Sequence, residues 1–293
     1  MHVAVNGTKL FFDVDGAKYV PDGRTMREKP TLIVLHGGPG HDHSVFKTGF
    51  CRLTDIAQIV YMDHRGNGRS PGSGPETWNL DQWGDDVKGL CDALEITRPI
   101  VYGVSFGGFV AQAYATRHPT HPGALILAST AAKIDFEAIY AAFETYGGEA
   151  ARRAAEDFWI RPSPESGHRY REICVPLYRV QPNTDLDAPY RTINRREVGY
   201  HFNGPNNEHG RMDFRKALSE IVCPTLVMSG DRDPVTPLAF SEEIVRCLPH
   251  NLVQFRQFQN CGHGILGDAS ESGFATIRKF VESQSPSSIS HST

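Results

Sequence analysis

The 293-residue sequence predicts an α/β fold: a mostly parallel sheet flanked by helices, with a helical insertion between two of its strands. Short apolar runs without alternation recur along the chain, and such runs are typical of parallel strands that are buried on both faces. Between several of these runs, apolar residues recur at helical spacing, which predicts crossover helices. One long segment lacks strand-like runs, and this segment predicts the insertion.

The expected elements follow one another in a regular order. Segments 2–5 and 10–14 flank Asn6-Gly7 and predict a hairpin at one edge of the sheet. The buried strands expected after the hairpin are 31–35, 59–63, 99–104, 124–130, 225–230 and 252–258. The helices expected between and after them are 80–94, 108–117, 238–248 and 274–281. Right-handed crossovers bring the carboxyl ends of the parallel strands to the same edge of the sheet.

The segment from Ala131 to about Asp213 breaks this alternation, because it is helical in pattern and rich in aromatic and charged residues. We expect it to form a helical cap over residues 132–213, on a core built from residues 1–131 and 214–293. Residues 284–293 have no apolar periodicity, so we expect a disordered tail there.

The composition, 40% hydrophobic and 22% charged, indicates a soluble globular protein rather than a disordered one. The net charge of −4 provides no basic footprint, so we expect no nucleic-acid partner. No apolar run approaches the ~18 residues that would span a bilayer, and the first residues do not resemble a signal peptide. The six scattered cysteines are expected to be mostly buried free thiols. These features predict a cytoplasmic protein without a membrane partner, and they leave the oligomeric state open.

The first candidate catalytic residue is Ser105, in the segment Gly103-Val104-Ser105-Phe106-Gly107. This segment follows an expected strand and precedes an expected helix, which is the setting of a nucleophile elbow. The turn is tight, so the positions two residues before and after the serine, Gly103 and Gly107, need small residues. The sequence therefore predicts Ser105 as a nucleophile at the edge of the sheet.

A serine hydroxyl needs a base that takes its proton and a third group that orients the base. Asp231 and Asp233 follow the strand at 225–230, and either could supply the orienting carboxylate. His263 follows the strand at 252–258 and lies between two glycines. Among the 13 histidines, it is the candidate base at the matching edge.

The segment 36–40, with the sequence HGGPG, follows the strand at 31–35. An acyl-transfer enzyme needs backbone N–H groups that stabilise the oxyanion, and proline has none to give. We therefore expect the amides of Gly38 and Phe106 to form the oxyanion hole. The segment 63–70, DHRGNGRS, is interpreted as a structural loop in which charges are paired beside the site.

These segments together resemble the α/β-hydrolase superfamily, and HGGPG more narrowly resembles its prolyl aminopeptidase (proline iminopeptidase) branch. The resemblance covers nearly the whole chain and implies that the insertion is a helical cap. It implies Ser105, Asp233 and His263 as the catalytic triad, with Gly38 and Phe106 as the oxyanion donors. It also favours Asp233 over Asp231 as the acid.

The resemblance weakens at the residues that hold the substrate's free amine in that branch. Acidic residues are expected after the cap's Gly-Pro-Asn and after the catalytic acid, where this sequence has Asn207 and Pro234. Glu208 and Glu197 are the candidate replacements. The aromatic cap adds further candidate substrate-binding residues, Trp159 and Tyr200.

The leading hypothesis is thus a serine hydrolase that forms an acyl-enzyme and cleaves a small amide, an N-terminal peptide bond or an ester. The alternatives are a carboxylesterase or lactonase acting on an uncharged small molecule, another chemistry of the same residues such as C–C bond hydrolysis, or a slowly turning-over small-molecule receptor. The expected partner is a small-molecule substrate. No metal or organic cofactor is implied.

Overall fold

A computed structural model describes residues 1–182, 187 and 191–284. Its centre is an eight-stranded sheet in the order β1-β2-β6-β5-β7-β8-β9-β10. The strands are β1 (His2–Val5), β2 (Thr8–Asp15), β5 (Thr31–Leu35), β6 (Gln58–Met62), β7 (Ile100–Val104), β8 (Ala124–Ala128), β9 (Thr225–Gly230) and β10 (Val253–Phe258). The pairs β1–β2 and β2–β6 are antiparallel, and the other pairs are parallel. The predicted α/β class and mostly parallel sheet are confirmed.

Both faces of the sheet are buried, which explains the apolar runs in its strands. In β5, Ile33 and Leu35 belong to one core cluster, whereas Leu32 and Val34 belong to the other. The first cluster includes residues of α2 (Leu80–Ala93), α3 (Phe106–Arg117), α9 (Arg215–Leu218) and α10 (Leu238–Cys247). The second includes residues of α1 (Lys47–Phe50), α11 (Ile265–Asp268) and α12 (Ser270–Gln284).

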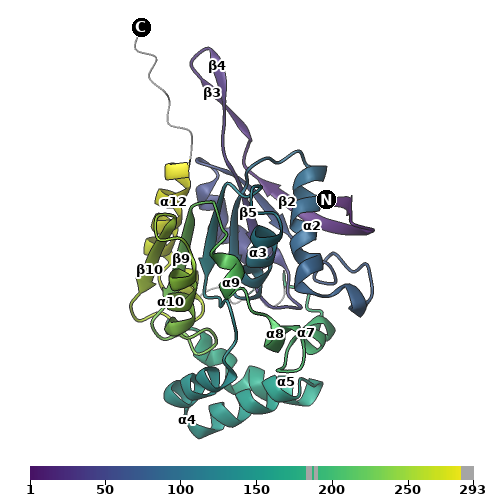
Figure 1. The fold of residues 1–293 in the computed structure, drawn as a ribbon, viewed down its shortest axis with the longest axis vertical. Coiled ribbons are helices and arrows are strands. Elements are labelled where there is room, and N and C mark those ends of the chain that lie inside the picture. Colours follow the sequence, from purple (N-terminus) through teal and green to yellow (C-terminus); the bar gives the residue numbers. More distant parts are fainter. Residues whose placement is uncertain (183–186, 188–190, 285–293) are drawn as a thin grey trace.

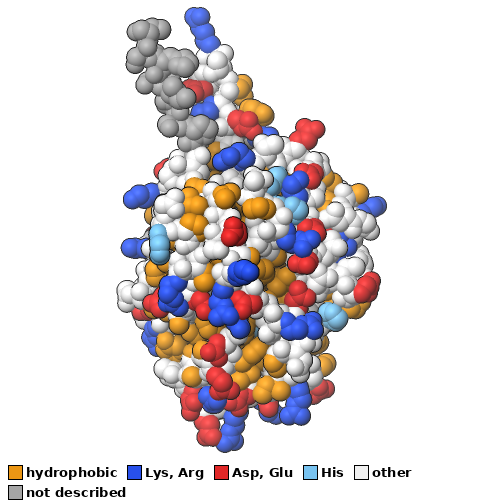
Figure 2. Space-filling view, in the orientation of Figure 1, with side chains coloured by type: hydrophobic (Ala, Val, Ile, Leu, Met, Phe, Trp, Pro, Cys, Tyr) orange, Lys and Arg blue, Asp and Glu red, His pale blue; other side chains and the backbone are white. Residues whose placement is uncertain are grey.

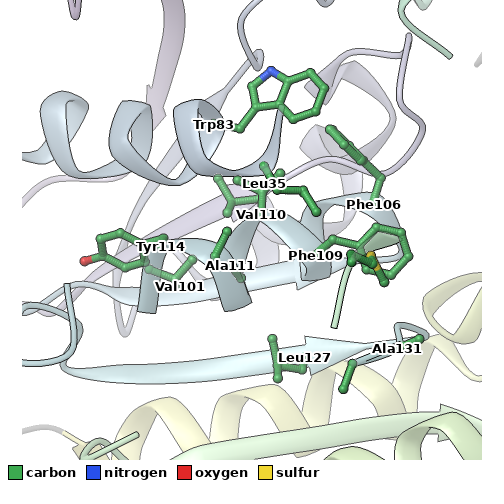
Figure 3. Close-up of a cluster of buried hydrophobic side chains, with 14 of the residues drawn as sticks. Leu35, Trp83, Val101, Phe106, Phe109, Val110, Ala111, Tyr114, Leu127 and Ala131 are labelled. Atoms are coloured by element: carbon green, nitrogen blue, oxygen red, sulfur yellow. The ribbon is translucent and has the colours of Figure 1, made fainter. Parts of the chain in front are cut away.

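Helix α3 directly follows Ser105 and is buried along most of its length. Gly107 allows it to lie close to β5, where a Cβ would collide with the Leu35 carbonyl. Phe106 packs on Trp83 of α2, and Phe109 packs on Phe202 and His209. Figure 3 shows Phe106 and Phe109 at one end of the helix and Tyr114 at the other, with Trp83 of α2 above. Since these side chains are at most 4% exposed, the helix that begins at Ser105 is rigidly held.

The insertion between β8 and β9 contains helices throughout its described part. They are α4 (Phe136–Ile160), α5 (Pro164–Ile173), the 3₁₀ helix η4 (Val175–Tyr178), α7 (Arg196–Phe202) and α8 (Glu208–Arg211). At its base, Lys133 and Asp213 form an antiparallel bridge, and the Phe214 amide donates to the Ala132 carbonyl at 2.9 Å. Figure 1 shows α4 and α5 at one end of the molecule. We call residues 132–213 the cap from here on.

Some local features differ from the sequence-based expectations. A hairpin of β3 (Tyr19–Asp22) and β4 (Thr25–Glu28) was not expected; it projects from the end of the molecule opposite the cap, and its residues are mostly exposed. Helix α12 begins four residues before its expected start and includes Gln284, so the expected tail was wrong at that residue. Residues 285–293 lie outside the described residues. The short 3₁₀ helices η1 (His43–Phe46), η2 (Cys51–Leu53) and η3 (Pro75–Thr77) complete the described elements.

The surface mixes charges of both signs. Figure 2 shows acidic and basic side chains interspersed on one face, including the end of the molecule where the cap helices lie. Within the described ranges, no helix is both long enough and apolar enough to cross a membrane. All six cysteines are free thiols; Cys51 is exposed, Cys247 is half-buried, and the others are buried.

Candidate active site

The candidate catalytic residues follow neighbouring parallel strands. Ser105 comes directly after β7, Asp233 three residues after β9, and His263 five residues after β10. Strands β7, β8, β9 and β10 are adjacent and parallel, so these three residues lie at the same edge of the sheet. This is the edge where open α/β sheets bind ligands.

Ser105 has the strained backbone expected of a nucleophile elbow, with φ of 55° and ψ of −122°. The Ser105 amide donates to the carbonyl of Ala128 at 3.0 Å, and the Ser105 carbonyl accepts from the Thr130 hydroxyl at 2.9 Å. A Cβ at Gly103 would collide with the carbonyl of Gly107, so glycine is required where the strand turns into the helix. The surroundings therefore hold Ser105 in a conformation that non-glycine residues seldom adopt.

Asp233 and His263 form a buried pair, with 2.8 Å between His263 Nδ1 and Asp233 Oδ2. They are 2% and 8% exposed, respectively. The amides of Val235 and Thr236 donate to Asp233 Oδ1 at 2.8 and 2.9 Å, and the Thr236 hydroxyl donates to Oδ2 at 2.7 Å. With the carboxylate oriented in this way, Nδ1 carries the proton, and Nε2 is left as the basic nitrogen.

Asp231, the other acid candidate, and the buried histidines His36 and His64 occupy structural positions. Asp231 accepts a hydrogen bond from the Cys261 amide at 3.1 Å and so braces the loop that carries His263. His36 and His64 are fully buried, with ring centroids 4.4 Å apart, and the His64 amide donates to His36 Nε2 at 3.2 Å. Burial lowers the pKa of both imidazoles.

The segment 36–40 approaches Ser105 from β5. A Cβ added at Gly37 would lie 3.5 Å from the Cβ of Ser105, so Gly37 packs against the candidate nucleophile and Gly38 is the next residue. Gly38 has φ of 131°, which favours glycine. The Phe106 ring is fully buried against His64, Trp83 and Phe202, at centroid distances of 5.3, 4.9 and 5.2 Å.

The segment 63–70 is a structural loop whose charges are paired. Asp63 Oδ1 lies 2.6 Å from His43 Nδ1, and Oδ2 accepts from the Arg69 amide at 2.8 Å. Burial acts to raise the pKa of Asp63, but the hydrogen bonds from His43 and Arg69 and the nearby His36 outweigh it and lower the pKa to about 2. The Asn67 side chain accepts from the Gly40 amide at 2.6 Å, which connects this loop to the segment 36–40.

The four substrate-binding candidates of the cap are dispersed. Glu208 accepts a hydrogen bond from the Leu80 amide at 2.9 Å, at the N-terminus of α2, and lines a cavity of about 320 Å³ that includes none of the triad candidates. Glu197 is exposed on α7, and Tyr200 is half-buried with its hydroxyl close to Gly167. Trp159 is 7% exposed, and its ring centroid lies 5.0 Å from that of His209.

His209 lies at the centre of an aromatic cluster that joins the cap to α3. Its ring centroid is 5.0 to 5.7 Å from those of Phe109, Phe136, Trp159 and Phe202. The residue is 3% exposed, and burial lowers the pKa of the imidazole to about 3. In the folded protein, the His209 imidazole is therefore uncharged at neutral pH.

His209 is expected to make the protein sensitive to acid. Between pH 6.5 and 3, the unfolded chain binds a proton at this residue that the folded chain does not, so the free energy of unfolding falls as the pH falls through this range. From pH 7 to pH 5 we expect the His209→Phe variant to lose about 2 kcal/mol less than the unsubstituted protein, as measured by urea unfolding. The exposed His250→Phe variant is the control, and equal losses in all three proteins would contradict the prediction.

Part of the cap reaches across the loop that carries His263; we call residues 178–181 the strap. The Tyr178 ring packs edge-on against His263 at a centroid distance of 5.1 Å, and its carbonyl accepts from the Gly264 amide at 3.1 Å. Burial raises the pKa of the Tyr178 phenol, whose oxygen lies 2.8 Å from that of Tyr170. The cap thus touches the candidate base directly.

Asp268 fastens the strap to the same loop. Its fully buried carboxylate accepts from the amides of Val180 and Gln181 at 3.0 and 2.9 Å, and from the Gly262 amide at 2.8 Å. Since Gly262 directly precedes His263, a single carboxylate joins the cap to the loop that carries the candidate base.

The sequence analysis missed Thr236, Tyr178 and Asp268. Thr236 had a usable signal, because an Asp followed three residues later by a Thr is a common side chain–backbone turn. Asp268 and Tyr178 had none, since their partners lie 6 and 85 residues away in the chain and no local pattern connects them. Within the described residues, no three His, Cys, Asp or Glu side chains are grouped so that they could hold a metal ion.

Comparison with known proteins gives a consistent result. The chain is 26% identical over 294 residues to proline iminopeptidase PfmaB of Pestalotiopsis fici, which covers 96% of this chain and 98% of the relative. It is 26% identical over 280 residues to the putative carbamate hydrolase RutD of a Caulobacter species, covering 92% and 97%. Its fold resembles the crystal structure of proline iminopeptidase from Mycobacterium smegmatis, with a TM-score of 0.74, 21% identity, and 97% and 98% coverage. Residues 30–270 match the family described as alpha/beta hydrolase fold, and the chain therefore belongs to that family of hydrolases.

Proposed function

We propose that this α/β hydrolase is a serine hydrolase that acts through an acyl-enzyme on a small, uncharged ester or amide. The observation that supports this most is the buried Asp233–His263 pair at the sheet edge where Ser105 has its elbow conformation. Val104, which directly precedes Ser105, and His263 line one cavity, so this cavity adjoins the proposed site.

In the proposed mechanism, His263 Nε2 takes the proton of Ser105 Oγ as the oxygen attacks the substrate's carbonyl carbon. The amides of Gly38 and Phe106 stabilise the oxyanion. His263 then protonates the leaving group, the acyl-enzyme remains, and His263 activates a water that hydrolyses it. Asp233 keeps the imidazole in the required tautomer and stabilises its protonated form.

The preference for an uncharged substrate rests on the carboxylates of the cap. A buried ammonium needs a carboxylate partner to compensate its lost hydration. Glu208 is bonded to the Leu80 amide and Glu197 is exposed, while Asn207 uses its side-chain amide to donate to the Asn203 carbonyl at 2.5 Å. These side chains do not supply the acidic subsite that an aminopeptidase of this type requires.

A second candidate is an aminopeptidase that releases an N-terminal residue. The similarity to proteins named proline iminopeptidase favours it, as does the segment HGGPG. Under this alternative, Glu208 would have to leave the Leu80 amide to meet the substrate's ammonium.

A substrate panel separates the two candidates. It compares 4-nitrophenyl acetate and butyrate, the 4-nitroanilides of proline and alanine, and the N-acetylated forms of these anilides. We expect ester turnover, and a kcat/KM for each N-acetylated anilide at least equal to that of the free amine. Turnover of only the free-amine compounds would contradict the proposal and favour the aminopeptidase.

A further inference from the structure

A second feature of the active site is a cavity of about 480 Å³ that reaches His263 from the face of the sheet covered by α1 and α12. We call it the α1–α12 cavity. Its apolar lining includes Phe46, Phe50, Tyr102, Ile265, Leu266 and Phe274, and its polar lining includes Thr48, Arg52, Ser129, Arg179, His263 and Ser270. Its volume is within the range of small-molecule sites, and aromatic and aliphatic side chains beside polar groups are typical of them.

The cavity adjoins the proposed site through His263, the one triad candidate that lines it, and through Val104, which directly precedes Ser105. It is also lined by Arg52 of η2 and Ser270 of α12, which are hydrogen bonded to each other at 3.2 Å. The Arg52 side chain is 39% exposed and also bonds Glu271, so the cavity reaches the surface at this residue.

The residues that line the cavity indicate which part of a substrate it holds. The carbonyl oxygen must meet the amides of Gly38 and Phe106, and neither residue lines the cavity. The leaving oxygen must lie within hydrogen-bond reach of His263 Nε2, because it takes its proton from there. A cavity lined by His263 and the residues after it, from Gly264 to Gly267, therefore lies on the leaving-group side.

Ser129 contributes a hydroxyl group to the lining of the cavity. It lines the cavity, is fully buried, and its hydroxyl has no hydrogen-bond partner among the residues that the structure describes. A buried hydroxyl without a partner is costly, and a polar atom of an occupant would supply the missing bond.

We propose that the α1–α12 cavity is the leaving-group subsite and that it takes the apolar alkyl or aryl part of an ester's alcohol. This inference rests on the proposed serine-hydrolase function and adds the substrate class on the alcohol side. As Ser105 Oγ bonds to the acyl carbon, the bond from that carbon to the alcohol oxygen breaks. The oxygen takes the proton from His263 Nε2, and a neutral alcohol remains in the cavity until it leaves toward α1 and α12.

Two series of esters test the inference, with acid release followed in a pH-stat. The first keeps acetate and lengthens a straight-chain alcohol from two to eight carbons; the second keeps ethanol and lengthens the acid. For the first series we expect kcat/KM to rise about threefold to fourfold per added methylene until the cavity is filled. Phe46→Trp is expected to lower kcat/KM for the longest alcohols at least tenfold, and Phe46→Ala to extend the accepted length.

The acid series is expected to be the same in both Phe46 variants and the unsubstituted protein. Phe255→Trp and Phe255→Ala are the matched controls, because Phe255 lies exposed on β10 and does not line the cavity. If the acid series shifts instead of the alcohol series, the cavity is an acyl site and the inference is wrong.

A binding measurement tests the leaving-group subsite independently of the proposed hydrolase activity. Titration of 4-fluorobenzyl alcohol, followed by ¹⁹F NMR, is expected to show saturable binding that Phe46→Trp weakens at least tenfold. Absence of binding to the unsubstituted protein would overturn the inference. Binding without any ester turnover would overturn the serine-hydrolase proposal and leave the alcohol site in place.

Discussion

Replacing Ser105 with alanine is expected to reduce kcat/KM for the best substrate by about 10⁴- to 10⁶-fold. The variant keeps the oxyanion amides and the Asp233–His263 pair, but it has no oxygen to carry the acyl group. The residual rate then reflects substrate binding and oxyanion stabilisation alone. Steady-state kinetics with the active ester of the panel give the measurement, and a fluorophosphonate probe should label the unsubstituted protein and not the variant.

The control for this experiment is Ser241→Ala. Ser241 is a serine of α10 that is 1% exposed, and its hydroxyl has no partner among the described residues. Its loss is expected to leave kcat/KM within a few-fold of the starting value. If Ser105→Ala retains more than about a hundredth of the activity while labelling persists, a different nucleophile is at work.

The largest effect on stability is expected at Asp86. Arg65 contacts its two carboxylate oxygens through Nε and Nη2, each at 2.7 Å, and the side chains are 3% and 0% exposed. Asn6 and Gln82 donate to the same carboxylate at 3.1 Å. Replacing Asp86 with alanine leaves a buried guanidinium without its counter-charge, which typically costs about 3–5 kcal/mol in the free energy of unfolding.

The neighbouring Asp85→Ala variant makes this a matched comparison. Asp85 also pairs with an arginine, Arg117 at 2.7 Å, but the two side chains are 33% and 37% exposed. Exposed pairs contribute about 0–1 kcal/mol. In urea unfolding, the free energies of unfolding of the two variants should therefore differ by at least 2 kcal/mol. Similar midpoints would show that the Arg65–Asp86 pair does not make the expected contribution to stability.

The core of the fold was readable from the sequence because its signal is local. Strand β5 is buried on both faces, so all five of its residues are apolar or β-branched, and its limits were predicted to the residue. The β3–β4 hairpin was missed for the opposite reason: its residues are mostly exposed and carry no apolar pattern to find. Where the side chains of a strand are exposed, the sequence carries no apolar pattern from which the strand can be predicted.

The candidate site divides in the same way. Ser105 and His263 could be singled out because glycines are required close to them in the sequence. At Gly103, Gly107 and Gly262 a Cβ would collide with neighbouring backbone atoms. The direction of Glu208 could not be foreseen, because it depends on the Leu80 amide, 128 residues away. Tertiary contacts of this kind decide which carboxylates face a substrate, so the substrate class was the part that the motifs left open.

The attachment of the cap has a consequence for how the enzyme can open. The strap, which Asp268 binds, lies between two parts of the cap, and these parts are attached to the rest of the molecule in different ways. The later part is bound to the core by hydrogen bonds from the amides of Ile193 to Asp42 and of Arg195 to Gly40, at 2.8 and 2.7 Å. The earlier part, with α4 and α5, is fixed at Lys133 and at the strap, and α4 also contacts Asp231 through the Tyr146 hydroxyl and α8 through the Trp159–His209 ring contact. A movement that carried α4 and α5 away from the core would therefore have to break the Trp159–His209 and Tyr146–Asp231 contacts as well as the hydrogen bonds of the strap.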